Sequence, residues 1–297
     1  YWRGVLGDGG PAPLDLPTDF VRPKVQSFRG ASVAMKVSAG VMRTVEKECT
    51  SYNVTLYMAL LAAFGRVLNE YSRQEAVCVG SPYAGRDESA TRELVGYFVN
   101  ILALKVCTVS QIAYGQVLKL AKSTVLGAFS HSHLPFHSLV GLLKVSRDVS
   151  RTPIFQAMLV VQEEQRQKGI QNKTSDDDSQ PSSIGVLVAS EAKFDLSLEV
   201  ALQENATLQG AFTCCADLFD GVTVERLKSH VEKAVIGPRS RLHNTETTLS
   251  AALASSRGCK ELKLHMHEPL HVTFKHSVSK VPSSIALVSA VESLSYD

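Results

Sequence analysis

The chain has 297 residues, 44% hydrophobic and 20% charged, which is enough to bury the core of one large domain or two ordinary ones. Its 31 basic and 29 acidic side chains leave a net charge of +2, so no strong field is available for nucleic acid or an anionic membrane. No apolar run approaches the roughly 18 residues of a membrane-spanning helix, and the six cysteines fit neither a disulfide framework nor a zinc ribbon, so we expect reduced thiols in a cytoplasmic protein.

Residues 1–28 are expected to form an extended connector. Prolines recur between residues 7 and 28, and a proline inside a helix removes a backbone hydrogen bond. The chain opens on Tyr1 and Trp2, with neither an initiator methionine nor the apolar stretch of a signal peptide, which indicates a cut within a longer chain.

Strands and helices then alternate. Residues 30–37 are expected to form a strand, and Ser38 to open a helix that reaches about Cys49. Thr55 begins a stronger helix to about Tyr71, in which apolar side chains recur at helical spacing. The elements expected next are a short buried strand at 76–80 stopped by Pro82, a charged loop at 83–95, a strand at 98–106, a helix at 110–127, a short helix after Pro135 and a buried strand at 155–161.

Residues 163–183 change character and are expected to be a solvated loop. The three aspartates at 176–178 lack the glycine and the terminal glutamate of a calcium loop, so they predict no calcium site. Residues 194–202 and 208–214 then alternate between apolar and polar side chains, which is typical of half-buried strands. A turn at Asn205 makes these two strands an antiparallel hairpin.

The lobe at 29–237 is therefore expected to be α/β, with a mixed sheet covered by helices and a closing helix at 222–236. Residues 238–267 are polar and are expected to form a linker. A new periodic segment occupies 268–297 and is too short to be a domain by itself.

Three short sequence motifs, which we call phrases, carry most of the functional information. They lie at 79–100, 131–137 and 147–156. Their order and spacing resemble the later core motifs of the condensation domain of nonribosomal peptide synthetases. Residues 1–28 are similar to the segment that joins the two lobes of that domain. Residues 268–297 look like the truncated start of an adenylation domain, which usually follows it.

The resemblance implies that this chain is the C-terminal of two chloramphenicol-acetyltransferase-like lobes enclosing a tunnel. Donor and acceptor carrier proteins deliver substrates on phosphopantetheine arms, and an amine attacks a thioester to give an amide. The arms are substrates, so no directly bound cofactor is expected. The motif that assists the reaction in this family, His-His-x-x-x-Asp-Gly, belongs to the N-terminal lobe and does not occur in these 297 residues. The chain is therefore expected to be inactive alone, with that lobe as a missing partner.

By resemblance, Arg86 is expected to reach across the lobes to the aspartate of the missing motif, because a guanidinium binds a carboxylate through two parallel bonds. The alternative is an exposed loop arginine. No catalytic residue is expected in this chain. Asn100 either contacts pantetheine or peptide amides, or caps a turn. The residues expected near the tunnel are Gly80, Ser81, Pro82, Gly96, Phe98, Val99 and Asn100; the two glycines and the proline are expected to punctuate a loop.

The other motif residues are expected to be structural, and Arg147, Asp148 and Arg151 to form an ion network at a turn. Three histidines, at 131, 133 and 137, have the wrong spacing for a helix-borne metal pair, so no metal site is expected. The family commonly has Asp and Glu where this chain has His133 and His137, and Thr where it has Ile101, which suggests a divergent member. The structural set is His131, Pro135, Phe136, Arg147, Asp148, Arg151, Pro153 and Phe155.

Two other functions stay open. One is a non-catalytic docking or scaffold lobe of a degenerate synthetase, and an intact upstream His-His-x-x-x-Asp-Gly would argue against it. The other is a variant of the same fold that epimerises, cyclises or forms esters; a hydroxyl acceptor would identify the ester-forming variant. In each case the resemblance places the chain in a multidomain enzyme of secondary-metabolite biosynthesis.

Overall fold

The computed structural model describes residues 1–87, 89–91, 94–107, 113–163, 191–203 and 205–236, together with strands at 285–288 and 293–295. The chain divides into two compact units, Tyr1–Pro238 and Arg239–Asp297. The loop expected at 163–183 lies, from residue 164 on, outside the described residues, as does the linker expected at 238–267.

Within the described part of the first unit, six strands form one mixed sheet in the order β1-β6-β5-β4-β2-β3. Strand β4 runs parallel to β2 and β5, and the other neighbours are antiparallel. The predicted α/β class with a mixed sheet is confirmed, and the predicted hairpin is present as β5 and β6. The strands are β1 (Gly30–Val37), β2 (Ala76–Tyr83), β3 (Asn100–Cys107), β4 (Ala157–Glu163), β5 (Leu196–Leu202) and β6 (Leu208–Cys215).

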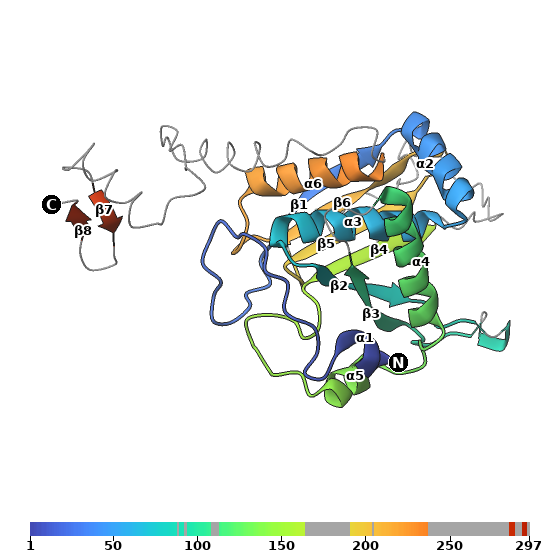
Figure 1. Cartoon of the computed structure of the whole chain (residues 1–297), viewed down its shortest axis with the longest axis horizontal. Helices are drawn as coiled ribbons and strands as arrows, with labels where there is room; N and C mark the ends of the chain where they lie inside the picture. Colours follow the sequence, from blue (N-terminus) through green and yellow to red (C-terminus); the bar gives the residue numbers. More distant parts are fainter. Residues whose placement is uncertain are drawn as a thin grey trace, which may run out of the picture. The chain divides into compact units, whose positions relative to one another are not determined.

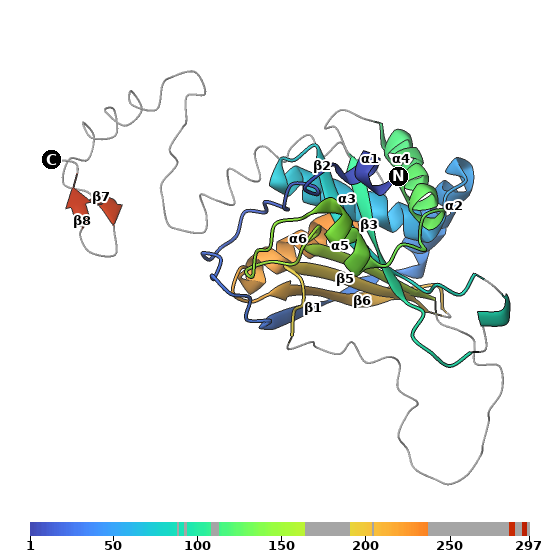
Figure 2. The same cartoon turned by 90° about the horizontal axis from the view of Figure 1, so that it is seen from below.

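Helices cover one face of this sheet (Figures 1 and 2). Helix α3 lies between α4 and α6, and α2 packs against α3 and α4. The Phe64 ring of α3 meets Phe212 of β6 edge to face, with ring centroids 6.1 Å apart, so the predicted apolar stripe holds the two layers together. The covering helices are α2 (Ala39–Tyr52), α3 (Leu56–Ser72), α4 (Tyr114–Phe129) and α6 (Gly221–Val235).

Strand β2 continues past Gly80, so the expectation that Pro82 stops the strand is wrong. Its pairing with β4 covers only Val79 and Gly80, whereas its pairing with β3 extends to Tyr83. At Pro82 the strand therefore has a neighbour on one side only, and a proline without an N–H is tolerated at such an edge position. Gly80 and Pro82 accordingly lie within a strand and not in the predicted loop.

Helix α1 (Trp2–Leu6) departs from the expectation that the whole of residues 1–28 is extended. The prolines begin only at Pro11, and Trp2 and Leu6 are both buried from the same side of one helical turn. Helix α1 lies beside α5 (Phe136–Leu143) near β3 (Figure 1), and just after α1 the N–H of Gly9 donates to the carbonyl of Leu143 at 2.9 Å.

Residues 7–28, which we call the strap, contain no helix or strand, as their prolines predict. The strap is nevertheless bonded to the lobe along its length. The Gln74 side chain binds the backbone on both sides of Leu14, at 3.0 Å to each partner. The Asp19 carboxylate accepts from the N–H of Asp220 at 2.8 Å and from the hydroxyl of Thr223 at 3.0 Å, at the start of α6.

In the second unit the structure describes one antiparallel pair, β7 (Ile285–Val288) and β8 (Ser293–Ser295). Across the described ranges, no helix is both long and apolar enough to cross a membrane.

Candidate functional site

The three sequence phrases meet around Gly80 of β2. A Cβ atom at this position would overlap the ring of Phe155, which comes from the third phrase. Only glycine leaves room for a ring so close to the strand backbone. The buried Phe155 ring packs in turn on Phe136 of the second phrase, with centroids 5.3 Å apart, and on Phe194, at 5.6 Å.

The turn before β4 fixes the direction of Phe155. Ile154 has a φ of 70°, which is uncommon for a β-branched residue because its side chain crowds the backbone there. The N–H of Phe155 donates to the carbonyl of Pro153 at 2.8 Å, and the Thr152 hydroxyl donates to the Phe155 carbonyl at 2.7 Å. These contacts hold the strained turn that aims Phe155 at Gly80.

Asn100 joins the first phrase to the second through its side-chain amide. Its Nδ2 donates to the carbonyls of Ser132 and Leu134, at 2.8 and 2.9 Å. Its Oδ1 accepts from the N–H of Ile101 at 2.9 Å and of Phe136 at 3.1 Å. Of the two roles expected for Asn100, this geometry corresponds to the structural one, since both ends of the amide bind the chain itself.

Arg86 organises the loop between β2 and β3. Its guanidinium donates to the carbonyls of Thr91, Leu94 (2.9 Å) and Gly96 (3.5 Å), and lies 4.6 Å above the ring centroid of Phe98. The loop is therefore folded around a cation, which stabilises both the backbone carbonyls and the aromatic face.

Residues within 83–101 and 132–137 contribute the lining of a solvent-open pocket of about 650 Å³ next to Asn100. Phe98 and Val99, both predicted near the tunnel, line it with Asn100. Ser81 does not: it is buried, and its hydroxyl donates to the carbonyl of Leu159 at 2.9 Å. The lining residues are Tyr83, Gly85, Asp87, Thr91, Tyr97, Phe98, Val99, Asn100, Ile101, Ser132, His133, Pro135, Phe136 and His137.

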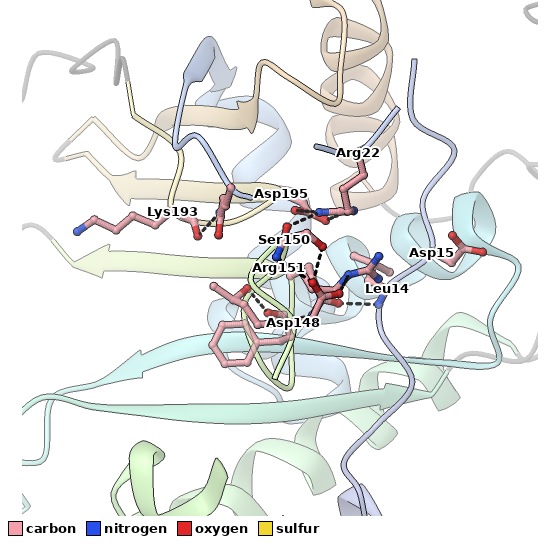
Figure 3. Close-up of polar contacts among 12 residues, drawn as sticks. Leu14, Asp15, Arg22, Asp148, Ser150, Arg151, Lys193 and Asp195 are labelled. Carbon is pink, nitrogen blue, oxygen red and sulfur yellow. Dashed lines mark hydrogen bonds and ion pairs between the residues drawn. The ribbon is translucent and has the colours of Figure 1, made fainter. Parts of the chain in front are cut away.

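Arg22 of the strap and Asp195, immediately before β5, form a two-bond ion pair, which we call the Arg22–Asp195 clasp (Figure 3). Nη1 of Arg22 lies 3.0 Å from Oδ1 of Asp195 and also donates to the carbonyl of Ser150 at 3.2 Å. The Asp195 side chain is 6% exposed and that of Arg22 is 19% exposed. The hydrogen bond to Asp195 raises the pKa of Arg22.

Asp148 and Arg151, two of the three residues of the predicted ion network, form an ion pair at the turn before β4, with Nε 3.0 Å from Oδ2. The hydroxyl and the N–H of Ser150 both donate to Asp148, at 2.6 and 2.8 Å, and these bonds lower the pKa of that carboxyl, with Arg151 adding to the effect. Arg147 is exposed and takes no part in this pair.

The second phrase is held from the N-terminus. The indole N–H of Trp2 donates to the carbonyl of His131 at 3.1 Å, and the rings of Tyr1 and His131 stack with centroids 4.0 Å apart. His133 and His137 line the pocket instead. Across the described residues, no three His, Cys, Asp or Glu side chains come close enough to hold a metal ion.

Sequence reasoning missed the roles of Arg22, Asp195 and Gln156. Gln156 is buried, accepts from the N–H of Leu14 at 2.6 Å, and donates to the carbonyl of Thr152 at 2.7 Å. The partners in the clasp are 173 positions apart, and no local pattern pairs charges at that distance. Two features of the sequence pointed to the charged pair: Arg22 stands beside Pro23, and Asp195 stands between the apolar residues Phe194 and Leu196.

Comparison with known proteins gives concordant matches. The family model described as "Condensation domain" matches residues 1–254. Over the whole chain, gramicidin S synthase 2 of Brevibacillus brevis is 32% identical, tyrocidine synthase 3 of Brevibacillus parabrevis 33%, and malpinin synthetase of Mortierella alpina 31%. The chain covers only 7%, 4% and 4% of these three relatives.

Solved structures share the fold. The X-domain from teicoplanin biosynthesis matches with a TM-score of 0.68 and 22% identity, over 82% of this chain and 55% of that one. The four-domain nonribosomal peptide synthetase holo-AB3403 matches with a TM-score of 0.70 and 21% identity, over 99% of this chain and 23% of that one. The chloramphenicol-acetyltransferase-like fold class predicted from the sequence is confirmed.

Replacing Gly80 by alanine is expected to lower the free energy of unfolding by about 1–3 kcal/mol, because the new methyl group overlaps the Phe155 ring. Chemical denaturation followed by circular dichroism measures the loss. Gly40→Ala is the matched control: a Cβ there meets nothing within 4 Å, so the change is neutral or stabilising. Adding Phe155→Leu to Gly80→Ala restores part of the loss, and strict additivity of the two changes would contradict the contact.

Arg22→Ala is expected to lower the free energy of unfolding by about 3–5 kcal/mol, since it leaves the buried Asp195 carboxylate without its partner. The double variant Arg22→Met, Asp195→Leu recovers most of this loss, because neither charge remains buried. Arg29→Ala, which removes the exposed pair with Asp217, costs at most about 1 kcal/mol. Equal losses for Arg22→Ala and Arg29→Ala in the same denaturation assay would rule out the clasp as a buried charge pair.

Proposed function

The chain belongs to the condensation-domain family of nonribosomal peptide synthetases, and from this membership we propose that residues 29–237 are the C-terminal lobe of a domain that joins two carrier-bound substrates. The family forms amide bonds. The strap would then be part of the connection between two lobes, and residues 268–297 the start of an adenylation domain.

One observation carries the proposal: two of the three phrases that resemble the family motifs line a single pocket, and the third supports that pocket from behind. Asn100 and Phe98 come from the first phrase, and His133 and Phe136 from the second. Phe155 of the third phrase lies behind Phe136. Residues as far apart in the sequence as Tyr83 and His137 thus line one pocket, with Phe155 packed behind Phe136.

The reaction needs a neutral amine on the acceptor arm and a thioester on the donor arm. The amine nitrogen attacks the thioester carbonyl, a tetrahedral oxyanion forms, and the C–S bond then breaks. The products are an amide on the acceptor arm and a thiol on the donor arm, with the proton lost by the nitrogen accounting for the thiol hydrogen. Orientation of two tethered reactants is worth about 7–11 kcal/mol, so a shaped wall without a catalytic side chain contributes to rate.

The imidazole of the His-His-x-x-x-Asp-Gly motif would come from the N-terminal lobe, since the motif does not occur in this chain. We assign Arg86 the role of partner to the aspartate of that motif. Its guanidinium sits at the mouth of the β2–β3 loop and orders that loop through Leu94 and Gly96. The carboxylate of that motif would be bound by guanidinium nitrogens that the loop carbonyls already hold in place.

The partners in this proposal are that lobe, the donor and acceptor carrier proteins and the downstream adenylation domain, in the cytoplasm. Phosphopantetheine enters as an arm of the carriers. A docking lobe without activity is the second candidate, favoured by His133, His137 and Ile101, which stand where the family commonly has Asp, Glu and Thr.

The purified 297-residue chain, mixed with two thioester-loaded carriers, is expected to form amide no faster than the carriers alone. With an N-terminal lobe that carries His-His-x-x-x-Asp-Gly, the rate rises above that background, as measured by mass spectrometry of the released product. Amide formation by the chain alone would contradict the assignment of the reactive imidazole to the N-terminal lobe. A complete domain whose upstream motif is intact and which still forms no amide would favour the docking lobe.

In that complete domain, Arg86→Ala is expected to lower the rate about tenfold or more, the effect of losing a hydrogen-bonded charge pair. Arg43→Ala, on the exposed side of α2, is the control and leaves the rate unchanged. An unchanged rate in Arg86→Ala with normal yield of folded protein would remove Arg86 from the mechanism.

A further inference from the structure

We propose that the pocket beside Asn100 receives an aromatic amino-acid side chain carried by one of the two tethered substrates. The inference rests on the condensing function proposed above and adds the chemical class of the substrate. A volume of about 650 Å³ lies within the range of roughly 300–1,000 Å³ found for small-molecule pockets.

The walls of the pocket are rich in aromatic rings: Tyr83, Tyr97, Phe98 and Phe136 all line it. Aromatic rings attract one another in offset or edge-to-face arrangements, in addition to the gain from burying apolar surface. Phe136 is fixed from behind by Phe155, at 5.3 Å between centroids, so one wall is rigid. A planar side chain entering the pocket therefore meets preformed partners.

The charges in the lining argue against an acidic guest. Asp87 is the carboxylate among the described lining residues, and it accepts a hydrogen bond from the hydroxyl of Tyr83. Neither lysine nor arginine is among the lining residues that the structure describes. An acidic side chain would be repelled by the Asp87 carboxylate, and the nearby Arg86 guanidinium, over the Phe98 ring, is the group that the proposed function assigns to the aspartate of the other lobe.

A basic guest meets a different obstacle. Asp87, the carboxylate of the described lining, already accepts a hydrogen bond from Tyr83, and the neighbouring His133 and His137 carry no negative charge that would bind a cation. Polar recognition is also limited, because the amide of Asn100 is used on Ser132, Leu134 and Phe136. The lining thus suits an uncharged ring better than a cation or a polar side chain.

The test measures binding to the purified full chain of four soluble probes, the ethyl amides of phenylalanine, cyclohexylalanine, lysine and aspartate, by ligand-observed nuclear magnetic resonance. Phenylalanine and cyclohexylalanine differ little in size, and only the first has a π system. We expect the phenylalanine amide to bind about threefold to tenfold tighter than the cyclohexylalanine amide, the range that aromatic pairing contributes beyond burial.

Two variants locate the effect. Tyr97 is 88% exposed at the pocket rim, so Tyr97→Leu leaves the core intact, and because one of the four lining rings is lost the preference for phenylalanine over cyclohexylalanine is expected to fall. Phe20→Leu is the matched control on the strap, at a ring that is 52% exposed and does not line the pocket, and it keeps the preference.

Equal binding of phenylalanine and cyclohexylalanine amides would overturn the proposal. So would tightest binding of the lysine or the aspartate amide, no saturable binding of the phenylalanine amide at its solubility limit, or a preference that Tyr97→Leu leaves unchanged. The assay contains neither carriers nor a second lobe. A negative result in this binding assay therefore does not contradict the proposed condensing function. Conversely, if the chain and the N-terminal lobe form no amide from the loaded carriers, the measured preference for an aromatic ring is unaffected.

Discussion

Gly80 of β2 has no side chain, and the ring of Phe155 occupies the space that any side chain there would fill. The rest of the site is built outward from this contact. Phe155 supports Phe136, Phe136 forms a wall of the pocket, and Asn100 ties the segment that carries Phe136 back to β3. Because each step is a close-packed or fully bonded contact, a small change at Gly80 is transmitted to the pocket wall.

The strap has a different kind of attachment. A segment rich in proline forms few backbone bonds of its own, so its position depends on side chains elsewhere in the lobe. The Arg22–Asp195 clasp supplies a buried charge pair, Gln156 fixes Leu14, and Asp19 binds the start of α6. A buried pair adds little net stability compared with apolar packing, but it is costly to break in half. It therefore gives the strap one preferred register on the lobe.

Much of the fold followed from periodicity. The apolar stripe of α3 and the alternation in β5 and β6 are local patterns, and local patterns determine local structure. The extension of β2 through Pro82 was not predictable, because it depends on how far β4 runs alongside. In the candidate site, the motif phrases named Phe98, Asn100 and Phe136, but only three-dimensional packing shows that Asn100 is turned toward the chain and that Ser81 is buried away from the pocket. The Arg22–Asp195 clasp joins residues 173 positions apart, and a single sequence carries no record of such pairings.

In the proposed function, this chain forms one wall of a reaction chamber and a separate lobe supplies the imidazole. A structure of the complete domain with a pantetheine-tethered aminoacyl amide tests it most directly. We expect the arm to pass between the lobes and to reach the pocket lined by Phe98 and His137, with the His-His-x-x-x-Asp-Gly imidazole facing it. An arm that runs elsewhere, with this pocket open on the outer surface of the domain, would contradict the claim.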